Sequence, residues 1–273
     1  MNKESVLAQP NEESIFLWVD HAWNRQGNGE FCSWIDPYLI QTGVPVGAIL
    51  ICPGGAYAGQ SFHEGEPVAR QFNRNGFHAF VLHYRVSPFR HPAPLHDIAR
   101  AMRIIRWHAS AWKIKPDKIA TCGFSAGGHL AGSLGIYFDR GDPQAEYLVE
   151  RLSCKPDALI LCYPVITTGN FANKTSFANL LGNNVSSSVL RQMSLELLVR
   201  SDTPPTFLWH TVDDEGVSVE NSLLFAQALR KYGIPFEAHL YPHGGHGGGL
   251  SLSDKHVATW MSLCCQWLRK MDW

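Results

Sequence analysis

Short apolar segments recur along the chain, and polar or amphipathic stretches separate them. Most of these segments are rich in Val, Ile, Leu and Phe and lack alternation between apolar and polar positions, which is typical of strands buried on both faces of a parallel sheet. The pattern predicts strands at residues 46–52, 77–84, 118–122, 157–163, 205–211 and 235–241.

Apolar positions between these strands advance by steps of three and four residues, which is the period of a helix with one buried face. Helices are predicted at residues 97–112, 219–232 and 254–270. The first of these helices also carries a basic face, which we interpret as solvated surface and which consists of Arg100, Arg103 and Arg106.

The alternation of strands and helices predicts the α/β class, with a three-layer α/β/α sandwich around a mostly parallel central sheet. We expect residues 1–273 to form a single domain, because α/β folds of this length are often undivided. Residues 165–203 interrupt the alternation, are rich in Asn and Ser, and contain a predicted helix at 189–199. We interpret this segment as a small cap inserted over the strand ends, with a peripheral decoration as the alternative.

The charges of the chain are balanced, with 23 Lys and Arg against 24 Asp and Glu. Since no long run of Lys or Arg is present, neither nucleic acid nor an anionic membrane surface is an expected partner. The first residues are polar, and no apolar stretch approaches the length of a membrane span. We therefore expect a cytoplasmic protein, without membrane segments, that acts on small neutral molecules. A homo-oligomer is compatible with the sequence.

The chain has seven cysteines, an odd number, and several of them lie inside apolar segments. This distribution favours buried, reduced thiols over a disulfide framework. No HExxH or paired CxxC spacing organises the histidines. His243 and His246 are close enough in sequence to share a metal, but further ligands at the usual spacings are missing, so no metal is expected.

A Gly-x-Ser-x-Gly pentapeptide at residues 123–127 joins the strand predicted at 118–122 to a following helix. A nucleophilic serine needs such a sharp turn, so that the hydroxyl projects from the sheet. Glycines on either side remove side chains that would collide across the turn. Ser125 is therefore the candidate nucleophile, and the N–H of Ala126 is a candidate oxyanion donor. The alternative is an ordinary glycine-rich turn. His129 is interpreted as a packed or hydrogen-bonded histidine.

A second glycine-rich loop, Pro-Gly-Gly-Ala at residues 53–56, follows the strand predicted at 46–52. Esterases place a loop of this kind upstream of the nucleophile, where its backbone N–H groups stabilise the oxyanion. Gly55 and Ala56 are the candidate donors, and the adjacent Tyr57 is a candidate substrate-binding residue. Taken alone the loop is only a turn. Its position before Ser125 favours the functional interpretation.

A serine nucleophile requires a base, and the base requires an acid that orients it. The expected chain order is Ser, then Asp or Glu, then His. Asp213 and Asp214 follow the strand predicted at 205–211, and His246 lies in a glycine-rich loop after the next helix and strand. Asp214 is the preferred acid, with Asp213 as the fallback. His246 is the preferred base, and His243 is expected to support its loop. The alternative for the acids is solvated surface.

Several motifs together resemble one known group, namely PGGAY, Tyr84-Arg85, Asp97 before a helix, GFSAGGHLAG, PPTFLWHTVDDEGVSVENSLLFAQAL and HGGHG. They are similar to carbohydrate-esterase-like α/β hydrolases, a group of acetyl xylan esterases and feruloyl or acetyl esterases. The resemblance extends over residues 47–246. It implies the α/β-hydrolase fold and removal of short acyl groups, chiefly acetyl, from sugar hydroxyls, without a metal or cofactor. Departures are Ala56 for a usual Gly, and residues 216–218, where Val-Val-Pro is commoner.

Three functions are therefore compared. The leading hypothesis is a serine esterase that removes acetyl groups from sugars or oligosaccharides. A general short-chain carboxylesterase, or a peptidase or formamidase on the same scaffold, is the second, because specificity depends on the pocket walls rather than on the triad. The third is a hydrolase fold without activity that binds a ligand. Such a protein would often have lost a triad residue, whereas all three candidates are present here.

Overall fold

The computed structural model of the protein describes residues 9–18 and 32–273. Its strands form one sheet in the order β1-β2-β4-β3-β5-β6-β7-β8. The strands from β3 to β8 run parallel, whereas β1 and β2 are antiparallel to their neighbours. Their bounds are Ile15–Phe16 (β1), Trp34–Tyr38 (β2), Val46–Cys52 (β3), His78–His83 (β4), Ile114–Phe124 (β5), Ala158–Cys162 (β6), Thr206–Thr211 (β7) and Phe236–Tyr241 (β8).

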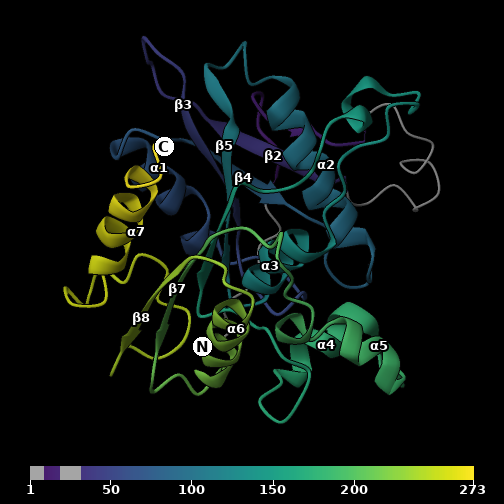
Figure 1. The fold of residues 1–273 in the computed structure, drawn as a ribbon, viewed down its shortest axis with the longest axis vertical. Helices are drawn as coiled ribbons and strands as arrows, with labels where there is room; N and C mark the ends of the chain where they lie inside the picture. Colours follow the sequence, from purple (N-terminus) through teal and green to yellow (C-terminus); the bar gives the residue numbers. More distant parts are fainter. Residues whose placement is uncertain (1–8, 19–31) are drawn as a thin grey trace.

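Helices cover both faces of this sheet (Figure 1). Helices α1 and α7 pack on one face, and α2, α3 and α6 pack on the other, with a separate apolar core on each side of the sheet. The α-helices are Glu66–Arg74 (α1), Ala93–Trp107 (α2), Ala126–Tyr137 (α3), Lys174–Leu181 (α4), Ser187–Gln192 (α5), Glu220–Lys231 (α6) and Thr259–Arg269 (α7). Short 3₁₀ turns occur at Phe62–Glu64 (η2), Leu148–Arg151 (η3) and Leu195–Leu197 (η4).

The predicted three-layer sandwich with a mostly parallel sheet is therefore confirmed, and the arrangement is an α/β-hydrolase fold. Each of the six predicted strands is present: β3 has the predicted bounds, and the other five have shifted ends. Strands β1 and β2 and helix α1 were not predicted. The antiparallel strand β2 reads Trp-Ile-Asp-Pro-Tyr, which mixes polar and apolar positions and contains a proline, so it lacks the apolar run of a central strand.

Three predicted helices have different bounds in the structure. Helix α2 spans Ala93–Trp107 rather than 97–112, because prolines at its start fit the first helical turn and residues 108–113 turn back into β5. Helix α7 begins at Thr259 rather than at 254. The helix predicted at 189–199 is divided into α5 and η4, and between them the Ser194 hydroxyl accepts a hydrogen bond from the backbone N–H of Thr168.

The interpretation of the basic face of α2 as solvated surface is wrong. Arg100 and Arg103 are only 6% and 7% exposed. Arg100 contacts Glu150 at 2.6 Å, Arg103 contacts Asp139, and Arg106 contacts Asp157 at 3.1 Å. The connection between α3 and β6 runs over this face and supplies both carboxylates and backbone carbonyls. Helical periodicity predicts a charged face, but it does not show whether water or a polar segment of the same chain covers that face.

The segment 165–203 contains α4, α5 and η4, which project from one end of the sheet (Figure 1). Its side chains contact loops that follow the carboxyl ends of two strands. Asn179 donates a hydrogen bond from Nδ2 to the carbonyl of Ala56 at 2.8 Å, in the loop after β3. Asn173 donates to the carbonyl of Gly216 at 2.8 Å, in the loop after β7. The segment thus fixes the backbone of both loops.

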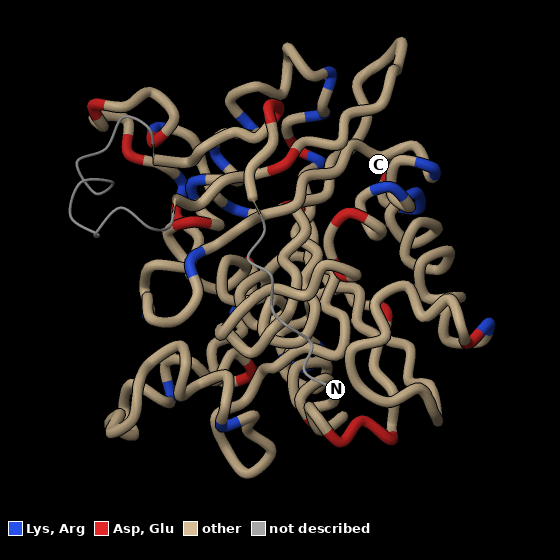
Figure 2. Tube along the Cα trace, turned by 180° about the vertical axis from the view of Figure 1, so that it is seen from behind, with Lys and Arg blue, Asp and Glu red and all other residues tan. Residues whose placement is uncertain are grey.

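Side-chain chemistry elsewhere agrees with a reduced, charge-balanced protein. The cysteines at positions 52, 122, 154, 162, 264 and 265 are buried free thiols, and Cys32 is half-buried. Lysines and arginines lie among aspartates and glutamates along the chain (Figure 2). Within residues 9–18 and 32–273, we find no helix whose length and apolar character would suit a membrane span.

Candidate active site

The candidate catalytic residues lie in loops at the carboxyl ends of parallel strands. Ser125 follows β5, Asp214 follows β7 and His246 follows β8. In parallel α/β sheets the carboxyl ends of the strands meet at one edge, where loops from distant parts of the chain can converge. The glycine-rich loop at 53–57 follows β3 and reaches the same edge. The topology of the sheet therefore explains why these segments meet.

Ser125 occupies the turn between β5 and α3 in a left-handed conformation, with φ 53° and ψ −119°. This conformation is costly for a residue with a side chain and is typical of functional turns. A Cβ added at Gly123 would lie 2.1 Å from the carbonyl oxygen of Gly127, so no other residue fits there. A Cβ added at Gly127 would lie 2.1 Å from the carbonyl oxygen of Cys52. The pentapeptide thus permits the turn and packs it against the end of β3.

The structure brings Ser125, His246 and Asp214 into one chain of hydrogen bonds. Ser125 Oγ lies 2.9 Å from His246 Nε2, and His246 Nδ1 lies 2.7 Å from Asp214 Oδ2. The Asp214 side chain is fully buried, whereas the His246 side chain is 29% exposed. The imidazole therefore lies between the serine and the carboxylate and can exchange protons with a bound molecule.

The neighbouring acid and histidine hold the loop that carries His246. Asp213 Oδ1 accepts a hydrogen bond from the N–H of Gly245 at 3.0 Å, and Oδ2 lies 3.3 Å from Nδ1 of the exposed His243. Of the two adjacent carboxylates, Asp214 is thus the one that contacts His246. Asp213 and His243 lie on the outer side of the same loop.

Several donors converge on the Asp214 carboxylate. Its Oδ1 accepts hydrogen bonds from the N–H groups of Gly216 and Val217, each at 2.8 Å. Burial raises the pKa of Asp214, but hydrogen bonds from His210, His246 and Val217 outweigh burial and hold this pKa well below its usual range. Asp214 is therefore negatively charged at neutral pH, which suits a group that orients His246 and stabilises its protonated form.

The backbone around Ser125 offers N–H groups for a developing oxyanion. Ala126 is the first residue of α3, and the N–H groups of a first helical turn have no acceptor within the helix. The loop at 53–57 lies against the serine, because a Cβ added at Gly54 would be 3.0 Å from Ser125 Cβ. Gly55 and Ala56 in this loop have positive φ angles of 133° and 53°. The candidate donors are thus on both sides of the serine.

Tyr57 does not occupy the position expected of a substrate-binding side chain. Its ring is 1% exposed, and its hydroxyl lies 3.0 Å from His129 Nδ1. His129 Nε2 in turn lies 2.9 Å from the carbonyl oxygen of Met193. Burial lowers the pKa of His129 to about 4, so the imidazole is neutral at physiological pH. Both side chains are buried beneath the surface of the site. The two contacts of the imidazole confirm the interpretation of His129 as a hydrogen-bonded histidine.

Glu64 is a buried acid of this site that sequence reasoning missed. The carboxylate is 2% exposed and joins two loops. Oε2 accepts a hydrogen bond from the N–H of Gly54 at 2.7 Å, and Oε1 accepts one from the Tyr163 hydroxyl at 2.6 Å. The Tyr163 hydroxyl also accepts a hydrogen bond from the N–H of Gly249 at 2.8 Å. Glu64 therefore connects the loop beside Ser125 to the loop that carries His246.

His210 is a second residue that the sequence did not reveal. Its side chain is fully buried, and Nε2 lies 3.2 Å from Asp214 Oδ2. Nδ1 of the same ring lies 2.7 Å from Ser222 Oγ, which fixes the ring on the side away from Asp214. His210 therefore supports the candidate acid. Its position four residues before Asp214, at the end of an apolar strand, was the only available signal.

Replacing Glu64 by glutamine is expected to lower kcat by about 10- to 100-fold, because loops displaced by a fraction of an ångström misplace the oxyanion donors. Gly54 and Tyr163 donate to different oxygens of Glu64, and a glutamine amide replaces one of these acceptors with an NH₂ donor, so it cannot accept both hydrogen bonds in this geometry. Steady-state kinetics on a small aryl acetate measures the effect, with the exposed Glu146→Gln as matched control. If Glu64→Gln keeps the kcat of the parent while its loops remain ordered, the positioning role is wrong.

Among the described residues, no group of three or more His, Cys, Asp or Glu side chains is arranged to hold a metal ion. A hydroxyl, an imidazole and a carboxylate in contact, beside several N–H groups, can perform acyl transfer.

Comparisons with known proteins agree with this chemistry. A protein-family model described as BD-FAE matches residues 36–229. An endo-1,4-beta-xylanase B of Butyrivibrio fibrisolvens is 42% identical over 249 residues, which are 89% of this chain and 39% of that protein. An acetylxylan esterase of Xylanibacter ruminicola is 31% identical over 230 residues, which are 82% of this chain and 45% of that protein.

A solved structure is similar over nearly the whole chain. It is an acetyl ester-xyloside bifunctional hydrolase from Caldicellulosiruptor lactoaceticus, with 44% identity and a TM-score of 0.93, and the match covers 96% of this chain and 97% of that one. In contrast, the chain spans less than half the length of the two curated relatives, 39% and 45%.

Proposed function

The chain belongs to the BD-FAE family, and on this premise we propose that it is a carboxylic ester hydrolase with a serine nucleophile, which removes short acyl groups, chiefly acetyl, from sugars or oligosaccharides. Ser125 is the proposed nucleophile, His246 the base and Asp214 the acid that orients it. The N–H groups of Ala126, Gly55 and Ala56 are the proposed oxyanion donors.

One observation carries the proposal. Ser125 Oγ lies 2.9 Å from His246 Nε2, and His246 Nδ1 lies 2.7 Å from Asp214 Oδ2, which belongs to a buried, ionised carboxylate. These contacts support a proton relay from the serine to the histidine. A serine hydroxyl is a weak nucleophile unless a base accepts its proton, and this arrangement supplies that base in a defined orientation.

The reaction then proceeds in two halves. Ser125 Oγ attacks the ester carbonyl while His246 takes the hydroxyl proton, and the carbonyl oxygen becomes an oxyanion stabilised by the N–H donors. The intermediate collapses as His246 protonates the departing alcohol, which leaves an acyl group on Ser125. Water, activated by His246, attacks this acyl group and releases the carboxylic acid. Ser125 and His246 end in their starting protonation states.

The sugar part of the proposal comes from relatives. The names of these relatives refer to xylan or xylosides, and two of them also refer to acetyl esters, so we propose an acetylated xylose-containing saccharide as the substrate class. We propose that the segment 165–203 acts as a cap that shapes the binding site, because its Asn173 and Asn179 bind the loops after β7 and β3. These loops carry Asp214 and the candidate oxyanion donors.

A substrate panel tests this function. We expect kcat/KM to be at least about tenfold higher for an acetylated xylo-oligosaccharide than for a simple alkyl acetate. When the acyl chain becomes too long for the pocket, kcat/KM should fall by about 10-fold or more for each further lengthening. The acyl group and the alcohol are varied separately. Equal kcat/KM for sugar and alkyl acetates would instead make the protein a general short-chain carboxylesterase.

A further inference from the structure

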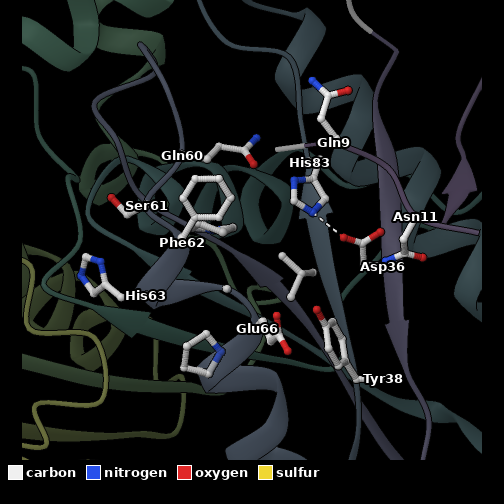
Figure 3. A pocket seen from close by; sticks show the side chains of 14 residues that line it. Gln9, Asn11, Asp36, Tyr38, Gln60, Ser61, Phe62, His63, Glu66 and His83 are labelled. Carbon is white, nitrogen blue, oxygen red and sulfur yellow. Dashed lines mark hydrogen bonds and ion pairs between the residues drawn. The ribbon is translucent and has the colours of Figure 1, made fainter. Parts of the chain in front are cut away.

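A cavity beside the candidate active site has no role in the acyl-transfer chemistry. Its volume is about 400 Å³, which lies within the range of about 300–1,000 Å³ usual for small-molecule sites. It lies over β2 and β4 and is bordered by the turn η2 and the first residues of α1. Figure 3 shows side chains from these elements around one opening.

The floor of the cavity is a fixed pair of polar side chains. Asp36 Oδ2 lies 2.8 Å from His83 Nε2, and Ser14 donates a hydrogen bond to Asp36 Oδ1. The His83 ring stacks on Trp34, with 4.4 Å between ring centroids. Burial raises the pKa of Asp36, but hydrogen bonds from His83 and Ser14 outweigh it, and the pKa is lowered. The carboxylate is thus ionised and held in one orientation.

The walls supply further hydrogen-bonding groups and one aromatic surface. Tyr38, Glu66 and Gln60 line the cavity, and the Phe62 side chain is exposed at its edge. Burial and the neighbouring carboxylate of Glu66 raise the pKa of Tyr38 to about 12, so its hydroxyl keeps its proton and can donate. The cavity therefore presents acceptors, donors and a ring face to the same space.

These groups favour a neutral molecule with several hydroxyls. Carboxylates, carboxamides and a phenol can bind vicinal hydroxyls, and an exposed ring can cover the C–H face of a sugar. An anion is disfavoured, because the described residues that line the cavity include Asp36 and Glu66 but neither Lys nor Arg, and the neighbouring Arg70 is already paired with Glu66 at 2.7 Å. Within the described residues, no cluster of metal-ligating side chains is present here.

The cavity and the candidate nucleophile lie on two sides of one short turn. His63 of η2 lines the cavity, and its Nε2 lies 2.8 Å from the carbonyl oxygen of Gly247, next to His246. Glu64, the next residue, points to the other side and binds the N–H of Gly54. A ligand in the cavity is therefore separated from the loops of the candidate active site by the width of this turn.

We propose that this cavity, with Asp36, Tyr38, Glu66 and Phe62 as its binding groups, holds a neutral glycosyl unit of the substrate while the acylated unit lies at Ser125. The inference rests on the proposed esterase function, which it extends from the acyl group to the alcohol. Such a site would make the enzyme discriminate between oligosaccharide esters and small esters, because only a long alcohol can reach both places.

The test compares two substrates in two cavity variants. Asp36→Asn is expected to lower kcat/KM for an acetylated xylo-oligosaccharide by about tenfold or more, which is the size expected for loss of one hydrogen bond to a charged group. Phe62→Ala is expected to lower it by about tenfold, because the ring no longer covers the apolar face of the sugar. The loss should appear mainly in KM. Activity on para-nitrophenyl acetate should stay within about twofold of the parent, because this ester is too short to reach the cavity. Trp107→Ala, which removes an exposed aromatic ring elsewhere, is the matched control.

A binding measurement separates this inference from the proposed function. Calorimetry with unacetylated xylo-oligosaccharide and the Ser125→Ala protein should show saturable binding that Phe62→Ala weakens. Failure of the parent to cleave para-nitrophenyl acetate would contradict the esterase proposal without affecting the calorimetry. Equal losses on both substrates, absence of sugar binding, or binding of an organic ammonium ion in place of the sugar would overturn the inference. Since Phe62 is exposed, its variant stays informative even where Asp36→Asn unfolds.

Discussion

Replacing Ser125 by alanine is expected to lower kcat for hydrolysis of an aryl acetate by about 10⁶-fold, to the level left by binding and oxyanion stabilisation alone. The hydroxyl is the group that would form the acyl-enzyme, and no other side chain in the described site holds a nucleophilic oxygen against His246 Nε2. KM should change little, since the N–H donors and the loops of the site remain. Steady-state kinetics on purified protein measures the loss.

The matched control for this substitution is Ser133→Ala. Ser133 is also a buried serine of α3, and it lies two helical turns beyond the candidate nucleophile. It should retain kcat within about threefold, because surface or core changes away from the reacting atoms act mainly on stability. A Ser125→Ala protein that keeps a tenth of the parent activity would contradict the assignment of the nucleophile.

Replacing Asp214 by asparagine is expected to lower kcat by about 10⁴-fold. The amide NH₂ cannot accept a hydrogen bond from His246 Nδ1–H, so the imidazole is no longer held with Nε2 free to accept the Ser125 proton. The effect should be large here because Asp214 Oδ1 is already engaged by the N–H groups of Gly216 and Val217 at 2.8 Å. These contacts force the substituted amide to present its donor to His246. Kinetics across a range of pH measures the change.

Asp213→Asn is the matched control, since it alters the adjacent carboxylate on the outer side of the loop. Its kcat should fall by less than about tenfold. If Asp213→Asn loses more activity than Asp214→Asn, the two acids are assigned the wrong way round.

The lowered pKa of Asp214 also makes the stability of the protein depend on pH. Its contribution to the free energy of unfolding is fully present above about pH 3.9, the usual pKa of Asp, and is lost as the pH falls through the lowered folded value.

The buried strands and the chain order of the site could be predicted because both leave local patterns. Apolar runs mark strands that are covered on both faces, and the six predicted ones match β3 to β8. Gly-x-Ser-x-Gly is recognisable because a nucleophile turn demands small neighbours. The later Asp and His are recognisable by their order along the chain. The structure places Ser125, His246 and Asp214 in contact, and their catalytic roles stay predictions.

What could not be predicted depends on contacts between distant segments. Glu64 lies in a short turn without any pattern, and only the fold buries it between Gly54 and Tyr163. The arginines on α2 look like solvated surface along the sequence, yet a later loop covers Arg100 and Arg103. Tyr163 lies 99 residues from Glu64, and Glu150 lies 50 residues from Arg100, so periodicity and composition carry no information about these contacts.

Tyr57 illustrates the same limit in the candidate site itself. Its position beside Gly55 and Ala56 suggests a side chain in contact with substrate. In the structure the positive φ values of Ala56 and Tyr57, 53° and 56°, turn the ring into the core, where it meets His129. A backbone reversal of this kind follows from packing across the whole edge of the sheet and not from the local sequence.

Covalent labelling by an organophosphate tests the central claim most directly, because it reports the activated hydroxyl without any assumption about the natural substrate. The account predicts that one phosphoryl group adds to the parent protein, that peptide mass spectrometry places it on Ser125, and that Ser125→Ala takes up none while remaining folded. Label on a different residue, or undiminished labelling of Ser125→Ala, would contradict it.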